Sequence, residues 1–234
     1  MEFVAGKGRA MRKWGVVITL FYAAIVLGIL TPAAIPIAGG DVPFSKAFYG
    51  DLRQLYAEYL VWIPVAIVVA GEAVLLFVTV DTSFRKLKPQ THIAISCAAG
   101  AMLFGLLAFA AIYCVGSAAE GDKFGQGFLG AAMGAIGVLV ALWVTWGVVF
   151  YLFLRNSSET ATRLVSWLLK GSVLELLIAV PCHVIVRRRG DCCAPAVTSF
   201  GIVTGIAVML LSFGPSVLLL YKKRLDGYEA RVAK

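Results

Sequence analysis

Charged side chains are scarce in this chain. Of its 234 residues only 15% are Asp, Glu, Lys or Arg, whereas 60% are hydrophobic, and the mean hydropathy is +0.88. A soluble domain of this size carries far more polar surface. The scarcity of charge therefore excludes a soluble globular protein and places the chain among integral membrane proteins.

The motifs of soluble enzymes are also missing. The chain has no phosphate-binding loop, no dinucleotide-binding glycine pattern, no nucleophile elbow and no His-Glu-x-x-His run. It has two histidines, and its five cysteines form no Cys-x-x-Cys pair of the kind that thiol oxidoreductases use. The sequence therefore favours a protein that is not an enzyme, while redox chemistry at the cysteines stays open.

What the chain does have is long apolar runs. Six of them reach the length of about 20 residues that a helix needs to cross the hydrocarbon layer. They are continuous rather than alternating, which predicts helices and not the strands of a barrel. The predicted spans are residues 14–38, 59–80, 92–115, 128–154, 164–186 and 200–221. The predicted fold is all-α: a polytopic membrane protein that forms one bundle of six transmembrane helices with short loops, a single domain over residues 1–234.

Basic residues are distributed unevenly among the connectors. They concentrate before the first span, in the second and fourth connectors and after the last span. By the positive-inside rule both termini are cytoplasmic. The net charge of +8 fits this topology and contact with anionic lipid headgroups, and no basic-aromatic pattern indicates nucleic-acid binding. We expect a multi-pass protein of the cell membrane, in a bacterial cytoplasmic membrane.

The first span also resembles a secretory signal, because a basic start and an apolar stretch precede small residues at positions 31–34. Cleavage there would leave five helices with the same orientation.

Four ionisable residues fall within the predicted spans: Glu72, Lys170, Glu175 and His183. A charge inside the bilayer is costly and needs a partner or water. At about 1.5 Å per residue, Glu72 and Lys170 lie at depths that permit an ion pair, whereas Glu175 has no cation at its level and is expected to be protonated or hydrated. Two interpretations stay open. In one, Lys170 reaches the membrane surface and the glutamates hydrogen-bond across helices; in the other, a proton or ion relay runs from Glu175 to His183, with Pro181 loosening the helix.

Four cysteines are predicted to share the external face: Cys114, Cys182, Cys192 and Cys193. They can form disulfides with one another or remain free thiols. Cys182, His183, Cys192 and Cys193 can also bind a metal ion such as zinc, copper or iron, although their spacing is not one of the regular zinc patterns. No cofactor other than this metal is indicated.

Arg187, Arg188 and Arg189 lie on the predicted external side, where basic residues are rare. They can hold lipid phosphates, pair with Asp191 and the acidic stretch 120–122, or bind an anionic substrate or a partner protein.

Three further features concern contacts. Gly130-x-x-x-Gly134 and Gly201-x-x-x-Gly205 predict close helix packing, either within the bundle or in a homo-oligomer or larger membrane complex. The amphipathic segment 46–58 is a candidate lid or docking surface at the membrane interface.

The leading functional hypothesis is a small transporter-like bundle, or an accessory subunit that scaffolds an envelope complex. The alternative is a membrane redox or metal-binding protein that uses the external Cys/His cluster.

Overall fold

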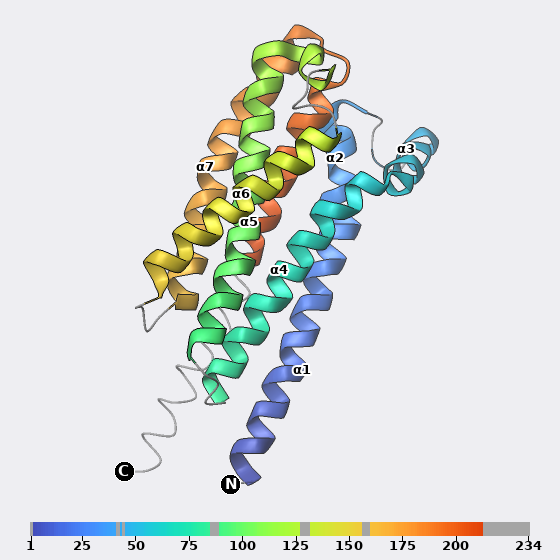
Figure 1. Cartoon of the computed structure of the whole chain (residues 1–234). Coiled ribbons are helices and arrows are strands. Elements are labelled where there is room, and N and C mark those ends of the chain that lie inside the picture. Colours follow the sequence, from blue (N-terminus) through green and yellow to red (C-terminus); the bar gives the residue numbers. More distant parts are fainter. Residues whose placement is uncertain are drawn as a thin grey trace.

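The computed structural model describes residues 2–40, 43, 45–84, 89–126, 132–155 and 160–212. Within these ranges the chain is helical, with turns and no strand. The elements are α1 (Glu2–Ile25), the π-helix η1 (Val26–Leu30), α2 (Thr31–Ala38), α3 (Lys46–Ala57), α4 (Tyr59–Phe84), α5 (Pro89–Glu120), the 3-10 helix η2 (Gly121–Gln126), α6 (Ala132–Leu154), α7 (Thr160–Arg189) and a last helix at Ala194–Ser212. The long helices run side by side as an elongated bundle (Figure 1).

Among the described residues, five helices are long and apolar enough to cross a membrane. They are Gly15–Ala38, Ile93–Phe124, Met133–Leu154, Arg163–Arg189 and Ala194–Ser212. A sixth span is obtained only if Lys46–Ala57 and Val61–Phe77, which meet at a bend of 74°, are counted together. The structure thus supports an integral membrane bundle of five or six spans.

Large apolar side chains face outward along the bundle, as lipid contact requires. Examples are Met133 and Phe153 of α6, with 81% and 69% of their surface exposed, and Leu177 of α7, with 67%. Because a water-soluble protein would bury such side chains, this surface agrees with a membrane environment.

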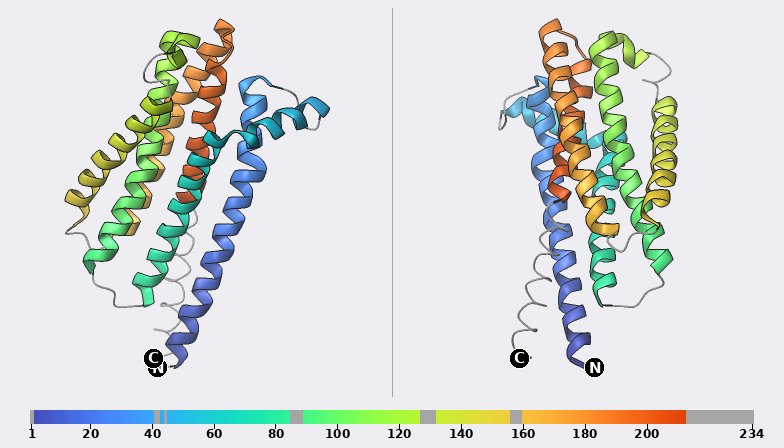
Figure 2. Two further views of the ribbon diagram at one scale, coloured as in Figure 1. Left: turned by 45° about the vertical axis from the view of Figure 1, so that its right-hand side comes forward. Right: turned by 90° about the vertical axis from the view of Figure 1, so that its left-hand side faces the viewer.

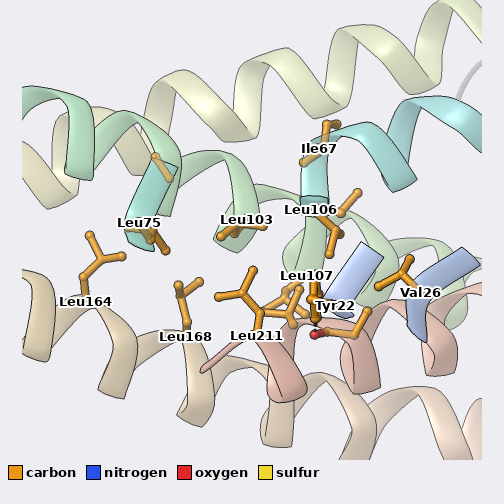
Figure 3. Packing of buried hydrophobic residues seen from close by; sticks show 14 of the residues in the cluster. Tyr22, Val26, Ile67, Leu75, Leu103, Leu106, Leu107, Leu164, Leu168 and Leu211 are labelled. Carbon is orange, nitrogen blue, oxygen red and sulfur yellow. Dashed lines mark hydrogen bonds between the residues drawn. The ribbon is translucent and has the colours of Figure 1, made fainter. Parts of the chain in front are cut away.

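The last helix occupies the centre of the bundle, between α1, α5 and α7 (Figure 2). Tyr22 of α1 donates a hydrogen bond from its hydroxyl to the Ala207 carbonyl, at 2.7 Å. Leu211 of the same helix is buried in the main apolar cluster with Leu103 of α5 and Leu168 of α7 (Figure 3). The last helix thus joins three helices that are far apart in the sequence.

The predicted connector 187–199 is wrong. α7 continues through Arg189, the next helix begins at Ala194, and the turn between them is only Gly190–Cys193. Pro195 lies in the first turn of the new helix, where its missing N–H costs nothing because that position has no intrahelical partner. The predicted end of the last span, like Gly130, lies outside the described residues.

The first membrane helix is distorted halfway along. α1, η1 and α2 form one continuous helix that widens to a π-turn at Val26–Leu30. Thr31 donates hydrogen bonds to the Val26 carbonyl from both its backbone N–H and its hydroxyl, the latter at 2.8 Å. Pro32 and Pro36 follow and remove two further backbone donors. π-turns of this kind often occur at functional positions.

Candidate functional site

Three helices end at the same end of the bundle, and arginines from α7 cap two of them. Arg187 donates a hydrogen bond to the Ala38 carbonyl at the end of α2, at 3.2 Å, and Arg189 donates to the Ala118 carbonyl near the end of α5, at 2.5 Å. A cation at a helix C-terminus satisfies free carbonyls and opposes the negative end of the helix dipole. We call this region the arginine end.

Glycine makes the capping of α2 possible. Gly39 follows that helix with a φ of 95°, and a Cβ there would lie 1.6 Å from Nη1 of Arg187. Any other residue would be strained at this φ and would displace the arginine.

The structure also shows Arg189 paired with Asp191, with Nη1 and Oδ2 3.6 Å apart. Arg188 is exposed and has no ion pair or hydrogen bond within the described ranges. Two of the three arginines thus have structural partners, and contact with lipid phosphate stays a prediction for Arg188.

Asp122, in η2, caps the last helix from a distant part of the chain. Its carboxylate accepts hydrogen bonds from the backbone N–H groups of Cys192 and Cys193, both at 2.8 Å, and of Ala194, at 3.0 Å. These are the free donors at the start of a helix, and an anion there is favoured by the helix dipole. The sequence did not reveal this role of Asp122, because its partners lie about seventy residues away.

The variant Asp122→Ala is expected to lower the melting temperature of the detergent-solubilised protein by several degrees, because three charge-assisted hydrogen bonds are lost together. Glu120→Ala is the matched control, since Glu120 is an exposed carboxylate close in sequence with no bond to other described residues. Equal melting temperatures for the two variants would contradict the capping role.

The predicted Cys/His cluster is only partly brought together. Cys114 and Cys182 are buried in one small apolar cluster with Ala179, whereas Cys192 and Cys193 are exposed on the turn before the last helix. All five cysteines are free thiols, and the described residues contain no group of three or more His, Cys, Asp or Glu side chains that could hold a metal ion. A disulfide or a metal at these positions stays a prediction.

Two polar contacts bear on the reactivity of this cluster. A hydrogen bond from the Cys193 thiol to the Cys192 side chain raises the pKa of Cys193, which disfavours the reactive thiolate. His183 is engaged elsewhere: its Nδ1 lies 2.8 Å from Oγ1 of Thr198, and its ring lies near the backbone of Ile37. The histidine thereby joins α7, the last helix and α2.

Glu72 of α4 is buried, with 1% of its surface exposed, and its Oε2 has no hydrogen-bond partner in the described chain. The predicted ion pair with Lys170 is not formed, because Lys170 is exposed on the outside of α7. The Tyr22 hydroxyl is instead close enough to Glu72 to interact with it electrostatically. The depth of a residue in the membrane carries no information on the direction in which its side chain points around the helix axis.

Glu175 of α7 is buried too, with 2% exposed, and neither carboxylate oxygen has a hydrogen-bond partner among the described residues. The side chain lies against the two glycines of the last helix. A Cβ at Gly205 would lie 1.9 Å from Oε2 of Glu175, and one at Gly201 would lie 3.3 Å from Oε1 and 2.4 Å from Sγ of Cys114. The Gly201-x-x-x-Gly205 motif thus provides space for Glu175 inside the bundle.

A cavity of about 480 Å³ opens between α1–α2, α4 and the last helix, and it is bordered by α3. Its walls are mainly apolar, with Val26 and Ile35 on one side, Val65 on α4, and Val203 on the last helix. This volume and lining are typical of a site for a small organic molecule. The cavity was not predicted, because its walls combine residues between Val26 and Val68 with residues of the last helix, which lie more than a hundred positions further along the chain.

The charged groups that line the cavity lie at one border, and a buried carboxylate lies beyond its other end. Asp51 and Gln54 of α3, and Glu58 at the end of that helix, lie at one border. At the other end, Val26, Val68 and Ala207 line the floor. Tyr22 lies one helical turn beyond Val26, and Glu72 lies one helical turn beyond Val68. The Tyr22–Ala207 hydrogen bond therefore closes the floor next to the buried carboxylate.

Comparison of the chain with protein-family models, with curated proteins and with solved structures finds no match. Its function must therefore be inferred from the chain's own residues and their geometry.

Proposed function

We propose that this protein is a small transporter-like bundle in which the cavity opens alternately to the two sides of the membrane and buried carboxylates carry a proton. The observation that carries the proposal is the cavity itself, which ends one helical turn from Glu72. In this proposal the arginine end faces the exterior and both termini are cytoplasmic, as the distribution of basic residues favours. The membrane is then the bacterial cytoplasmic membrane.

The walls of the cavity contain the breaks that a moving helix needs. The π-turn at Val26–Leu30, with Pro32 and Pro36 beyond it, forms one wall, and Pro64 lies inside α4, which forms another wall. Kinks in helices arise at proline and at π-turns, and transporters place discontinuous helices around their substrate sites. A scaffold has no need of a π-turn and of prolines inside the helices around one cavity.

The buried carboxylates support proton coupling. Glu72 and Glu175 each keep at least one oxygen without a hydrogen-bond partner in the described residues, on different helices and inside the bundle. Such intramembrane groups are expensive to keep and mark proton or ion pathways. In the proposal Glu72 exchanges its proton when the cavity floor opens, and Glu175 continues the path toward His183.

Cysteine accessibility tests the alternating opening without knowledge of the substrate. In a background with all five native cysteines replaced by alanine, a single cysteine is introduced as Ala207→Cys, on the cavity floor. We expect a membrane-impermeant methanethiosulfonate to modify it both in right-side-out and in inside-out vesicles. Such two-sided reactivity is the signature of a site exposed in turn to each side.

Two controls calibrate this measurement. Ala196→Cys, at an exposed position of the cavity lining near the arginine end, should react from one side only. Leu174→Cys, on the lipid-facing side of α7 with 60% of its surface exposed, should react from neither. If position 207 reacts from one side only, the chain is a static bundle and the scaffolding role replaces the transporter.

A further inference from the structure

We infer that the cavity binds a lipophilic cation: a small molecule with an apolar body and one positively charged amine head. As a statement about the transported substrate this rests on the proposed function, but binding itself is measured separately. The inference follows from the two ends of the cavity, which differ in chemistry.

The apolar part of the cavity sets the body of the ligand. Its walls offer mainly valine, isoleucine, leucine and alanine side chains, with three hydroxyls, of Thr31, Ser199 and Thr204. Two of these hydroxyls are already bonded to backbone carbonyls: Thr31 to Val26 and Ser199 to Ala196, both at 2.8 Å. A molecule that fills this part must gain its affinity from removal of apolar surface from water. Strongly hydrated ions and sugars are therefore poor ligands.

Residues of α3 determine which charge the head of the ligand should carry. Asp51, Gln54 and Glu58 follow one another at spacings of three and four residues, so they share one helix face, which is the face bordering the cavity. Asp51 lies near the backbone of Gly40, because a Cβ there would be 3.4 Å from Oδ2. Two carboxylates and one amide provide hydrogen-bond acceptors and negative charge.

No basic side chain offsets these acids among the described residues that line the cavity. Lys46 and Arg53 belong to the same helix but do not line the cavity, and both are exposed. Arg187 lies beside this lining, bonded to the carbonyl of Ala38. The two carboxylates of α3 outnumber its single charge, so the local field still attracts a cation. Phe200 of the last helix also lines the cavity and adds an aromatic ring, which favours a positive head.

α3 is held by the distorted part of the first membrane helix. The Tyr56 hydroxyl donates a hydrogen bond to the Leu27 carbonyl, within the π-turn, and Trp62 Nε1 donates to the Tyr56 carbonyl, at 3.0 Å. The helix that supplies the acidic head site is thus bonded to the helix that would have to bend. Binding of the cation at α3 is in this way connected to the break in the cavity wall.

Three matched probes test the charge of the ligand: 6-phenylhexylamine, 6-phenylhexanol and 6-phenylhexanoate, which share one apolar body and differ in the head. Isothermal titration of the full chain in a neutral detergent should give the tightest binding for the amine, weaker binding for the alcohol and the weakest for the carboxylate. Added salt should reduce the advantage of the amine, because the carboxylates are partly exposed to solvent.

The variant Asp51→Asn/Glu58→Gln removes both charges and keeps the size of the side chains. It should weaken amine binding by about tenfold and bring the affinities of the amine and the alcohol together. Glu120→Gln, an exposed carboxylate outside the cavity, should leave all three affinities unchanged. If the double variant does not fold, the charge of the ligand is still determined by the single variants and by the order of affinity of the three probes for the unmodified protein.

Equal binding of amine and alcohol to the unmodified protein, or an unchanged amine affinity in the double variant, would overturn the inference. The result is separable from the transport proposal. Amine binding together with one-sided reactivity at position 207 would leave a cation-binding protein that does not transport, whereas two-sided reactivity without an amine preference would leave a transporter of another substrate class.

Discussion

Gly205→Leu is expected to lower the free energy of unfolding by about 3 kcal/mol, the upper part of the range for overpacked cores. A first carbon at this position would already lie 1.9 Å from Oε2 of Glu175 and 2.9 Å from Cγ of Leu176. Glu175 can turn aside only within a fully packed region, and Leu176 belongs to the facing helix. The last helix would have to move away from α7, at the centre of the bundle. Unfolding in mixed micelles with increasing dodecyl sulfate measures the change.

Gly137→Leu is the matched control for this experiment. Gly137 lies at an exposed position of α6, and a Cβ added there would have no other atom within 4 Å. The substitution removes a flexible residue from a helix and adds lipid-facing apolar surface, so stability should stay the same or rise. A similar loss for both variants would mean that Gly205 is not a contact point between the helices.

Glu175→Gln is expected to reduce proton flux by about 100-fold, since a group that transfers protons typically contributes a factor of that order. Glutamine keeps the size and the hydrogen-bonding capacity of the side chain but cannot bind and release a proton at accessible pH. Flux is measured in proteoliposomes that contain a pH-sensitive dye, with a membrane potential set by potassium and valinomycin and with 6-phenylhexylamine present. Glu120→Gln serves as the control with an exposed carboxylate at the arginine end.

A second substitution at the same position separates function from structure. Glu175→Met removes two buried oxygens that have no hydrogen-bond partner within the described chain. It should therefore raise stability while proton flux is lost, because an unsatisfied buried polar group is destabilising. Functional sites typically retain an active group that lowers stability. Unchanged flux in the glutamine variant would assign Glu175 to packing alone.

The sequence was sufficient for the elements whose signals are local. Apolar length identified the membrane helices, and the spacing of apolar residues identified segment 46–58, which forms α3 from Lys46 to Ala57. Ser45 begins that helix with a side chain that accepts a hydrogen bond from the Phe48 N–H, at 3.0 Å. The burial of Glu72 and Glu175 followed from their place in apolar runs.

What the sequence did not provide depends on rotation and on distant contacts. The position of a residue around its helix is set by packing against neighbours, so the depth argument placed Glu72 and Lys170 level with each other but could not show that Lys170 faces outward. The start of the last helix was placed too late because its cap, Asp122, belongs to another connector. The cavity required four separate segments to be placed in space at once.

The bond from Asp122 to the start of the last helix has a consequence for how the chain is made. Synthesis proceeds from the N-terminus, so η2 has already emerged when Cys192 to Ala194 leave the ribosome. The Asp122 carboxylate is then already present at the membrane surface. It can accept the hydrogen bonds at the start of the last helix as soon as that helix enters the membrane. Insertion of the final span is thereby guided by a residue that was in place many codons earlier.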